Sequence, residues 1–181
     1  MTGTTRRNRL TDIDRKKITP EQEAVVARLG EGRGRIPTPF RVWLHSPRLA
    51  EGMEVIGTYL NNGAHLSDAE FEAATLATAV FWRSPYVVTN HTRHALKAGV
   101  PANAVQAILA GQRPAIEDKR LQAVCDFVGD LLAGASIEDE RFDAHDAVLG
   151  REGIAELTIL VGYYSTVSLA MRLHEVPSRG D

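Results

Sequence analysis

The chain has 181 residues, a formal net charge of −2 at pH 7 and a sequence pI near 6.3. This length suits one compact domain with a single core, and the near-neutral charge excludes a protein built to follow a nucleic-acid backbone or an anionic membrane surface. The single cysteine, Cys125, excludes an intramolecular disulfide and a thiolate cluster for zinc or for iron and sulfur.

A basic segment precedes the first helix signal. The stretch MTGTTRRNRLTDIDRKK has no apolar run behind it, so it predicts neither a signal peptide nor a membrane anchor. No other segment approaches eighteen consecutive apolar residues. We expect a flexible charged arm over residues 1–18, a single all-helical domain over residues 19–181 and a cytoplasmic protein.

Helix start and stop signals recur along the rest of the chain, and strand signals are nearly absent. Thr19 and Gln22 form a capping box around Pro20, and the GEGRG run is expected to end that helix. DAEFEAATLATAVFW, apolar on nearly every side, is expected to be the central buried helix. We predict an all-α domain of about seven or eight helices. The expected helical segments, of which 40–45 is only a short helical piece, lie near residues 20–29, 40–45, 47–60, 68–82, 84–98, 100–111, 117–133, 143–149 and 153–175.

The segment from Ser84 to Gly99 carries two histidines three residues apart. Ser84 is expected to cap the first-turn amides, Pro85 to occupy the first helical position and Gly99 to end the helix. At one hundred degrees per residue, His91 lies in the middle of the apolar stripe and His94 at its border. A histidine that faces a core is often only a packed, hydrogen-bonded side chain, so this pattern alone does not establish a site.

Glu72 occupies the first turns of the central helix, which has almost no polar face. Glu70 is explained by an S-x-x-E capping box, whereas nothing local explains Glu72, and a buried carboxylate requires a partner. Two interpretations remain open. In the first, Glu72 is simply a rim residue or pairs with Arg83. In the second, it meets His91 or His94 in a pocket and orients and charges the ring for acid and base chemistry.

These residues resemble the carboxymuconolactone decarboxylase family, whose redox branch includes the alkylhydroperoxidase AhpD. That branch has a Glu, a CxxC twelve residues later, and a His after three more residues. Glu72, Ser84, Val87 and His91 occupy these positions, with both thiols missing. Members often show C-E-Y-E-W before the His, of which SPYVV keeps Tyr86. The likeness extends over GRGRIPTPFRVWLHSPRLAEG, HALKAGVPANAVQAI and LTILVGYYSTVSLAMRLHEVP.

The resemblance implies an AhpD-like helical domain with a central buried helix hairpin. It also implies assembly as a dimer, trimer or hexamer, with the site on or near the hairpin formed by the helices of Glu72 and His91. The residues themselves agree on one point. So short a chain has more apolar helix surface than one small core needs, which favours a homo-oligomer with a buried subunit interface.

Thiol peroxidase activity is not expected, because Ser84 cannot pass through sulfenate and disulfide states and Cys125 has no matching thiol. We favour a cofactor-independent lyase, a decarboxylase or related isomerase, that acts on a small carboxylated lactone or keto acid. The conjugated carbonyl of such a substrate accepts the electrons released with carbon dioxide, so the protein need only stabilise the enolate and deliver a proton. The alternative is a non-catalytic small-molecule-binding or assembly member of the family.

In this interpretation His91 donates the proton to carbon, and Glu72 holds its tautomer and favours its charged form. Each candidate for substrate binding also has an ordinary structural interpretation, as an amphipathic aromatic, a surface histidine, a helix cap or scaffold. A metal site is not predicted, because His94 is expected to point off the line of His91 and no further ligand is indicated. The candidates for substrate binding are Tyr86, His94, Ser84, Trp43 and His45.

Overall fold

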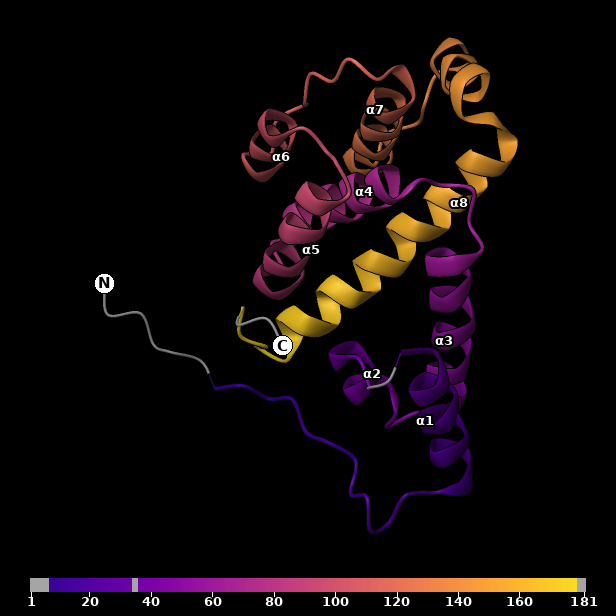
Figure 1. Cartoon of the computed structure of the whole chain (residues 1–181), viewed down its shortest axis with the longest axis vertical. Coiled ribbons are helices and arrows are strands. Elements are labelled where there is room, and N and C mark those ends of the chain that lie inside the picture. Colours follow the sequence, from indigo (N-terminus) through magenta and orange to yellow (C-terminus); the bar gives the residue numbers. More distant parts are fainter. Residues whose placement is uncertain (1–6, 34–35, 179–181) are drawn as a thin grey trace, which may run out of the picture.

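The computed structural model describes residues 7–33 and 36–178. These residues form eight α-helices and contain no strand (Figure 1). The all-α prediction is confirmed. Residues 1–6 of the predicted N-terminal arm lie outside the described residues. The helices are α1 (Pro20–Arg33), α2 (Thr38–Trp43), α3 (Pro47–Asn62), α4 (Asp68–Phe81), α5 (Pro85–Lys97), α6 (Ala102–Leu109), α7 (Lys119–Ala133) and α8 (Asp139–Leu173).

The two predicted capping boxes are present. At the start of α1, the Gln22 backbone N–H donates to Thr19 Oγ1 at 3.2 Å and the Thr19 N–H donates to Gln22 Oε1 at 3.0 Å. At the start of α4, Ser67 and Glu70 make the same reciprocal pair. Each box satisfies two amides that have no partner within the helix, which explains why these starts can be read from local sequence.

Two helices run further than the sequence signals indicate. α1 continues to Arg33 rather than to about residue 29, because a glycine such as Gly30 lowers helix propensity by only about 1 kcal/mol and does not prevent helical dihedral angles. α8 begins at Asp139 rather than near residue 143. The expected division of the C-terminal segment is nevertheless present, since Gly150 has φ 72° and ψ 163° and breaks α8 into two helical arms.

α4 is the central helix of the fold. It packs against α5, α6, α7 and α8, and its Ala73, Ala74, Leu76 and Ala79 are fully buried. The small alanine side chains let the surrounding helices approach closely, and burial of a side chain such as Leu76 contributes about 2 kcal/mol. The prediction of a central buried hairpin, α4 followed by α5, is therefore confirmed.

The longer arm of α8 crosses the molecule diagonally between the α4–α5 pair and the group formed by α1, α2 and α3 (Figure 1). Its Leu157, Leu160 and Met171 are buried in the main core. α8 is the one described helix that is long and apolar enough to cross a membrane, but half of its most apolar window is buried within the protein. A core helix of a soluble protein meets the same criterion, so this is weak evidence for a membrane span.

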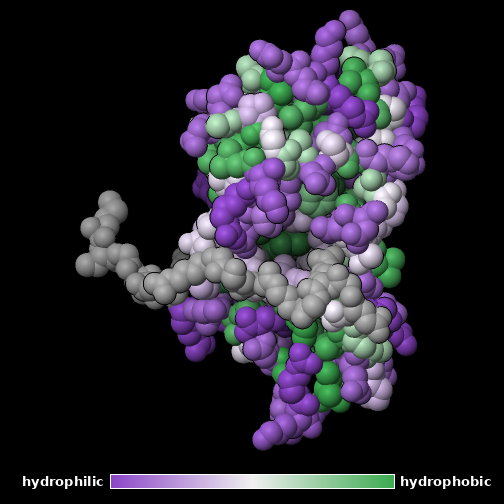
Figure 2. Space-filling model, in the orientation of Figure 1, coloured by the Kyte–Doolittle hydropathy of each residue, from purple (hydrophilic) through white to green (hydrophobic). Residues whose placement is uncertain are grey.

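Residues 7–18 lie against the helical body. Ile13 is buried, the Arg9 backbone N–H donates to the His174 carbonyl at 2.7 Å, and the Arg41 guanidinium makes two hydrogen bonds to the Asp12 carboxylate. Figure 2 shows hydrophobic residues exposed among polar ones both in the upper part of the molecule, which holds α4 to α7, and in the lower part, which holds α1 to α3.

Candidate functional site

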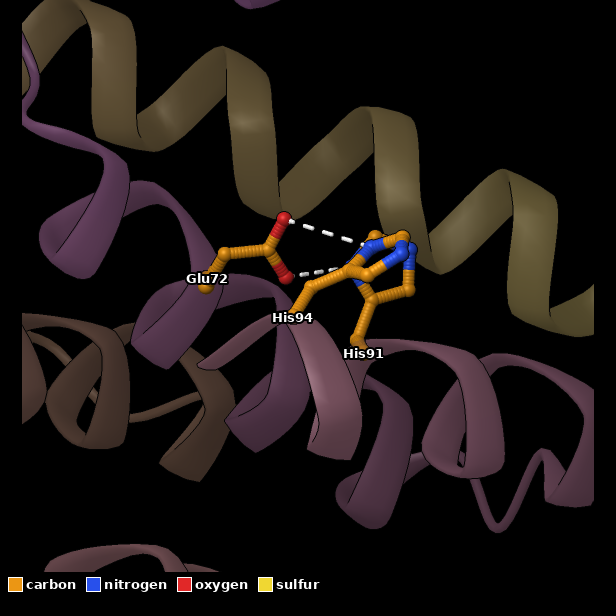
Figure 3. A group of neighbouring side chains, drawn as sticks. All are labelled: Glu72, His91 and His94. Carbon is orange, nitrogen blue, oxygen red and sulfur yellow. Dashed lines mark hydrogen bonds and ion pairs between the residues drawn. The ribbon is translucent and has the colours of Figure 1, made fainter. Parts of the chain in front are cut away.

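The turn between α4 and α5 brings Glu72 and His91 together. Figure 3 shows the Glu72 carboxylate on α4 facing two imidazole rings on α5. Glu72 Oε2 lies 2.7 Å from His91 Nδ1, and the two side chains are only 13% and 15% exposed. Glu72 therefore pairs with His91 and not with Arg83, whose side chain is exposed. The buried Glu72 carboxylate therefore has the partner that it requires, and this partner, His91, is one of the two histidines expected if Glu72 lies in a pocket.

His94 turns toward the same carboxylate. Its Nδ1 lies 3.7 Å from Glu72 Oε1, and the two imidazole rings are 5.5 Å apart and nearly perpendicular (Figure 3). The expectation that His94 points off the line of His91 is wrong. Residues three apart on a helix are neighbours on its surface, and the side-chain torsions are free to bring both rings to one partner. His94 is 54% exposed, so it forms the outer edge of the group.

A cavity of about 370 Å³ lies beside the Glu72–His91 pair. A second cavity of about 490 Å³ shares part of its wall, including Glu72 and His94. The wall of the first cavity combines carboxylate, imidazole, amide and guanidinium groups with aromatic rings, which is the composition expected of a small-molecule site. Its lining residues are Pro37, Thr38, Pro39, Phe40, Asn61, Phe71, Glu72, Tyr86, Val87, Asn90, His91, Arg93, His94, Tyr163, Tyr164 and Val167.

Two of the five phenylalanine and tyrosine rings in the wall, Tyr163 and Tyr164, come from α8. The Tyr164 ring meets the His91 ring edge-on at 5.0 Å and the Phe71 ring at 5.7 Å. Tyr163 lies beside it at 5.5 Å. Trp43 does not line the cavity, but its ring packs against Tyr163 at 6.0 Å and so supports the wall from behind. The contact with Tyr164 restrains the orientation of the His91 ring.

The structure places only some of the other predicted substrate-binding residues in the cavity wall. Tyr86 and His94 line the cavity, whereas Ser84 and His45 do not. His45 is exposed and its Nε2 lies 3.2 Å from the Thr11 carbonyl oxygen.

Ser84 occupies the N-cap position of α5, but its hydroxyl makes no capping bond and the predicted cap is wrong. The residue is fully buried, and its Oγ has no hydrogen-bond partner within the described residues. The Ser84 carbonyl does accept from the Val88 N–H at 3.0 Å, as the first acceptor of α5.

Sequence reasoning missed several residues that bring polar groups to the cavity, among them Asn61, Asn90 and Arg93. Arg93 is exposed, its Nη2 lies 3.4 Å from Asn90 Oδ1, and no ion pair of Arg93 is found among the described residues. A helical wheel places Arg93 away from the apolar stripe, and only its long side chain brings the guanidinium to the cavity. Its position between two site histidines was the one signal available.

Cys125 lies in the second cluster of buried residues, formed by α4, α5, α6 and α7, and does not line the Glu72–His91 cavity. Burial, with a smaller contribution from the Asp126 carboxylate, raises the pKa of this thiol to about 12. The prediction of a buried thiol is confirmed, and so high a pKa makes it a poor nucleophile at neutral pH.

Comparison with known proteins agrees with the fold. The uncharacterized peroxidase-related protein from Silicibacter sp. TM1040 is 14% identical, with a TM-score of 0.75 over 97% of this chain and 94% of that chain. A cysteine-to-alanine variant of the debrominase Bmp8 in complex with 2,3,4-tribromopyrrole is 15% identical, with a TM-score of 0.72 over 97% and 94% of the two chains. At these identities the likeness establishes a shared fold and not a shared activity. No curated protein matches the chain.

The sequence model of the carboxymuconolactone decarboxylase family matches residues 47–129, a range that holds α3 to α6, most of α7, and the whole Glu72–His91–His94 group. The structural neighbours have the same helical fold. The chain therefore carries a stretch of the carboxymuconolactone decarboxylase family over residues 47–129, and its single cysteine, Cys125, leaves no CxxC pair.

Proposed function

We propose that this protein is a cofactor-independent lyase, a decarboxylase or related isomerase, that acts on a small carboxylated lactone or keto acid. The observation that carries the proposal is the 2.7 Å contact between Glu72 and His91 in the wall of a cavity large enough for such a substrate. A carboxylate that fixes an imidazole beside a pocket is the usual arrangement for a histidine that transfers protons.

The contact assigns the two ring nitrogens of His91 to different tasks. Glu72 accepts a hydrogen bond from Nδ1–H, so Nε2 is the nitrogen that can give or take the substrate proton. Within the described residues, Nε2 has no hydrogen-bond partner in the protein. Because Glu72 and the Tyr164 ring both restrain the imidazole, His91 is held ready for reaction with little reorganisation.

The reaction needs no electron sink from the protein. When the carbon–carboxylate bond breaks, its electron pair enters the conjugated carbonyl of the substrate and carbon dioxide leaves. His91 then delivers a proton to the carbon of the resulting enolate. Asn61 and Asn90 lie in the same wall and can donate hydrogen bonds to the enolate oxygen.

The position of Arg93 in the cavity wall supports the proposal that the substrate has a carboxylate group. Its guanidinium lines the cavity without an ion-pair partner in the described part of the chain, and a guanidinium binds a carboxylate through two parallel hydrogen bonds. The debrominase Bmp8 with its small ring ligand, 2,3,4-tribromopyrrole, further supports a small cyclic substrate for this fold. Thiol-dependent chemistry is not proposed, since Ser84 and Val87 stand where the redox branch has its cysteines.

Substitution of His91 tests the proposal. His91→Ala is expected to lower turnover of a carboxylated lactone or β-keto acid by about 100-fold or more, the usual contribution of a general acid, while the helix content stays unchanged. The matched control is His65→Ala, which removes an exposed histidine that also lies beside glutamates but does not line the cavity. The measurement is the rate of carbon dioxide release or of substrate absorbance loss.

Two results would contradict the catalytic role. Unchanged turnover in His91→Ala would remove His91 from the reaction. Equal thermal stabilisation of the wild-type and His91→Ala proteins by such ligands, with no product formed, would instead support a non-catalytic binding protein of the same family.

A further inference from the structure

Three potential metal-ligand atoms converge between α4 and α5. One ring nitrogen each of His91 and His94 and one carboxylate oxygen of Glu72 all lie within 4.8 Å of one another. Figure 3 shows both rings on the same side of the carboxylate. The ligands come from two packed helices rather than from loops, so the spacing between them is fixed by the core of the hairpin.

The distances suit a small divalent ion. Zinc binds nitrogen and carboxylate oxygen at about 2.0 to 2.2 Å, so two ligands of one tetrahedral ion lie roughly 3.3 Å apart. The distance from His91 Nδ1 to Glu72 Oε2 is 2.7 Å and that from His94 Nδ1 to Glu72 Oε1 is 3.7 Å, so one oxygen of the carboxylate faces each ring at a distance near that value. His94 is 54% exposed, so its ring can move by the small distance that coordination requires.

The identity of the ligands also favours zinc. Two imidazoles and one carboxylate are a ligand set of catalytic zinc sites, in which the fourth position is left to water. Glu72 and His91 are 13% and 15% exposed, so the ion would be partly shielded from solvent. The two cavities that share Glu72 and His94 provide a route for the ion and room for the fourth ligand.

A second group of possible ligands, His65, Glu152 and Glu156, is less suited. The buried Glu156 carboxylate already accepts hydrogen bonds from the Tyr59 hydroxyl at 2.6 Å and from the His65 backbone N–H at 3.0 Å. His65 and Glu152 are 63% and 66% exposed. This group has a structural task, since it ties the connection between α3 and α4 to α8.

We propose that Glu72, His91 and His94 form a three-ligand binding site for Zn²⁺. The site goes beyond the proposed lyase activity and does not depend on it. Because the ion takes Glu72 Oε and His91 Nδ1 as ligands, it replaces the hydrogen bond on which the proton chemistry of His91 depends. Zinc and the lyase reaction therefore exclude one another in a given molecule, and zinc is expected to inhibit turnover.

Zinc titration of the full-length, chelator-treated protein tests the site. Calorimetry with ZnCl₂ is expected to show saturable binding, and His94→Ala is expected to weaken the tightest site by more than about 100-fold, since loss even of a residue that only supports a ligand costs 10- to 100-fold. Glu72→Gln, which keeps the side-chain size, is expected to weaken it similarly. His65→Ala is the matched control and is expected to change the affinity by less than about threefold, within the range of indirect effects.

The outcomes separate the zinc site from the lyase proposal. Absence of saturable zinc binding, or its loss in His65→Ala but not in His94→Ala, would overturn the zinc site. His91-dependent turnover by metal-free protein would support the lyase activity whichever way the titration falls. Zinc binding that requires His94, in a protein without turnover on any keto acid or lactone, would leave the zinc site standing and the lyase activity unsupported.

Discussion

Two glutamates on α4, two residues apart, have partners of different kinds. Glu70 closes the local capping box and also pairs with Arg120 at 2.8 Å. Glu72 has no local partner and meets His91, which lies on the next helix. The need of Glu72 for a partner could be predicted from its apolar surroundings, because an unpaired buried carboxylate is costly. The choice of His91 over Arg83 depends on how the α4–α5 turn closes, which local sequence does not determine.

The Cys125 thiol provides a prediction at the residue scale. With a pKa of about 12, only about one molecule in ten thousand carries the thiolate at pH 8. Iodoacetamide is therefore expected to modify the folded protein at least about 100-fold more slowly than the protein unfolded in guanidinium chloride. Mass spectrometry of timed samples measures both rates. Equal rates would show that the thiol is accessible and ionised in the folded state.

Two glycines in helices, Gly129 and Gly150, allow a prediction about the stability of the fold. Gly150 has φ 72° and ψ 163°, a combination essentially restricted to glycine, so Gly150→Ala is expected to lower the free energy of unfolding by about 1 to 3 kcal/mol. Gly129 lies inside α7, and an added Cβ there would meet no atom within 4 Å. Gly129→Ala is therefore expected to raise the free energy of unfolding by about 0.5 to 1 kcal/mol. Urea denaturation measures both changes, and effects of the same sign would contradict the assigned backbone conformations.

At the scale of the helix, the sequence predicts those features that depend only on residues close together in the chain. The starts of α1 and α4 follow from capping boxes, and the break in α8 follows from glycines near residue 150. The sequence does not predict those features that depend on contacts with a distant segment of the chain. The unbonded Ser84 hydroxyl and the reach of Arg93 into the cavity both depend on packing between helices. For the same reason the Tyr164–His91 contact, which joins α8 to α5, could not be predicted from either helix alone.

The surface of the whole molecule favours self-association. Large apolar side chains are exposed on α3, among them Leu49, Val55 and Tyr59, and on α8, where Ile159 is half exposed. We propose that these surfaces are covered in a homo-oligomer, because a monomer gains nothing from leaving them in water.

Light scattering on the purified protein tests this proposal. At micromolar concentration the mass is expected to be a multiple of 19.8 kDa. Val55→Glu is expected to shift it toward the monomer, because it places a charge in the interface. Gln106→Glu adds a carboxylate at an exposed polar position of α6, whose described residues include no exposed large apolar side chain, and is expected to leave the mass unchanged. A wild-type mass of one chain would contradict the oligomer.

One part of the cavity wall lies inside the stretch matched by the family model and another part lies outside it, and the two parts differ in how easily substitutions can accumulate during evolution. Its acid and imidazoles lie on α4 and α5, inside the stretch that the family shares, whereas Phe40, Tyr163 and Tyr164 lie outside that stretch. Substitutions of Phe40 or Tyr163 can reshape the pocket while Tyr164 still contacts the His91 ring and the helix pair still places Glu72 beside His91. Paralogues with one reactive centre and divergent substrate preference could therefore arise by exchanging only the outer wall.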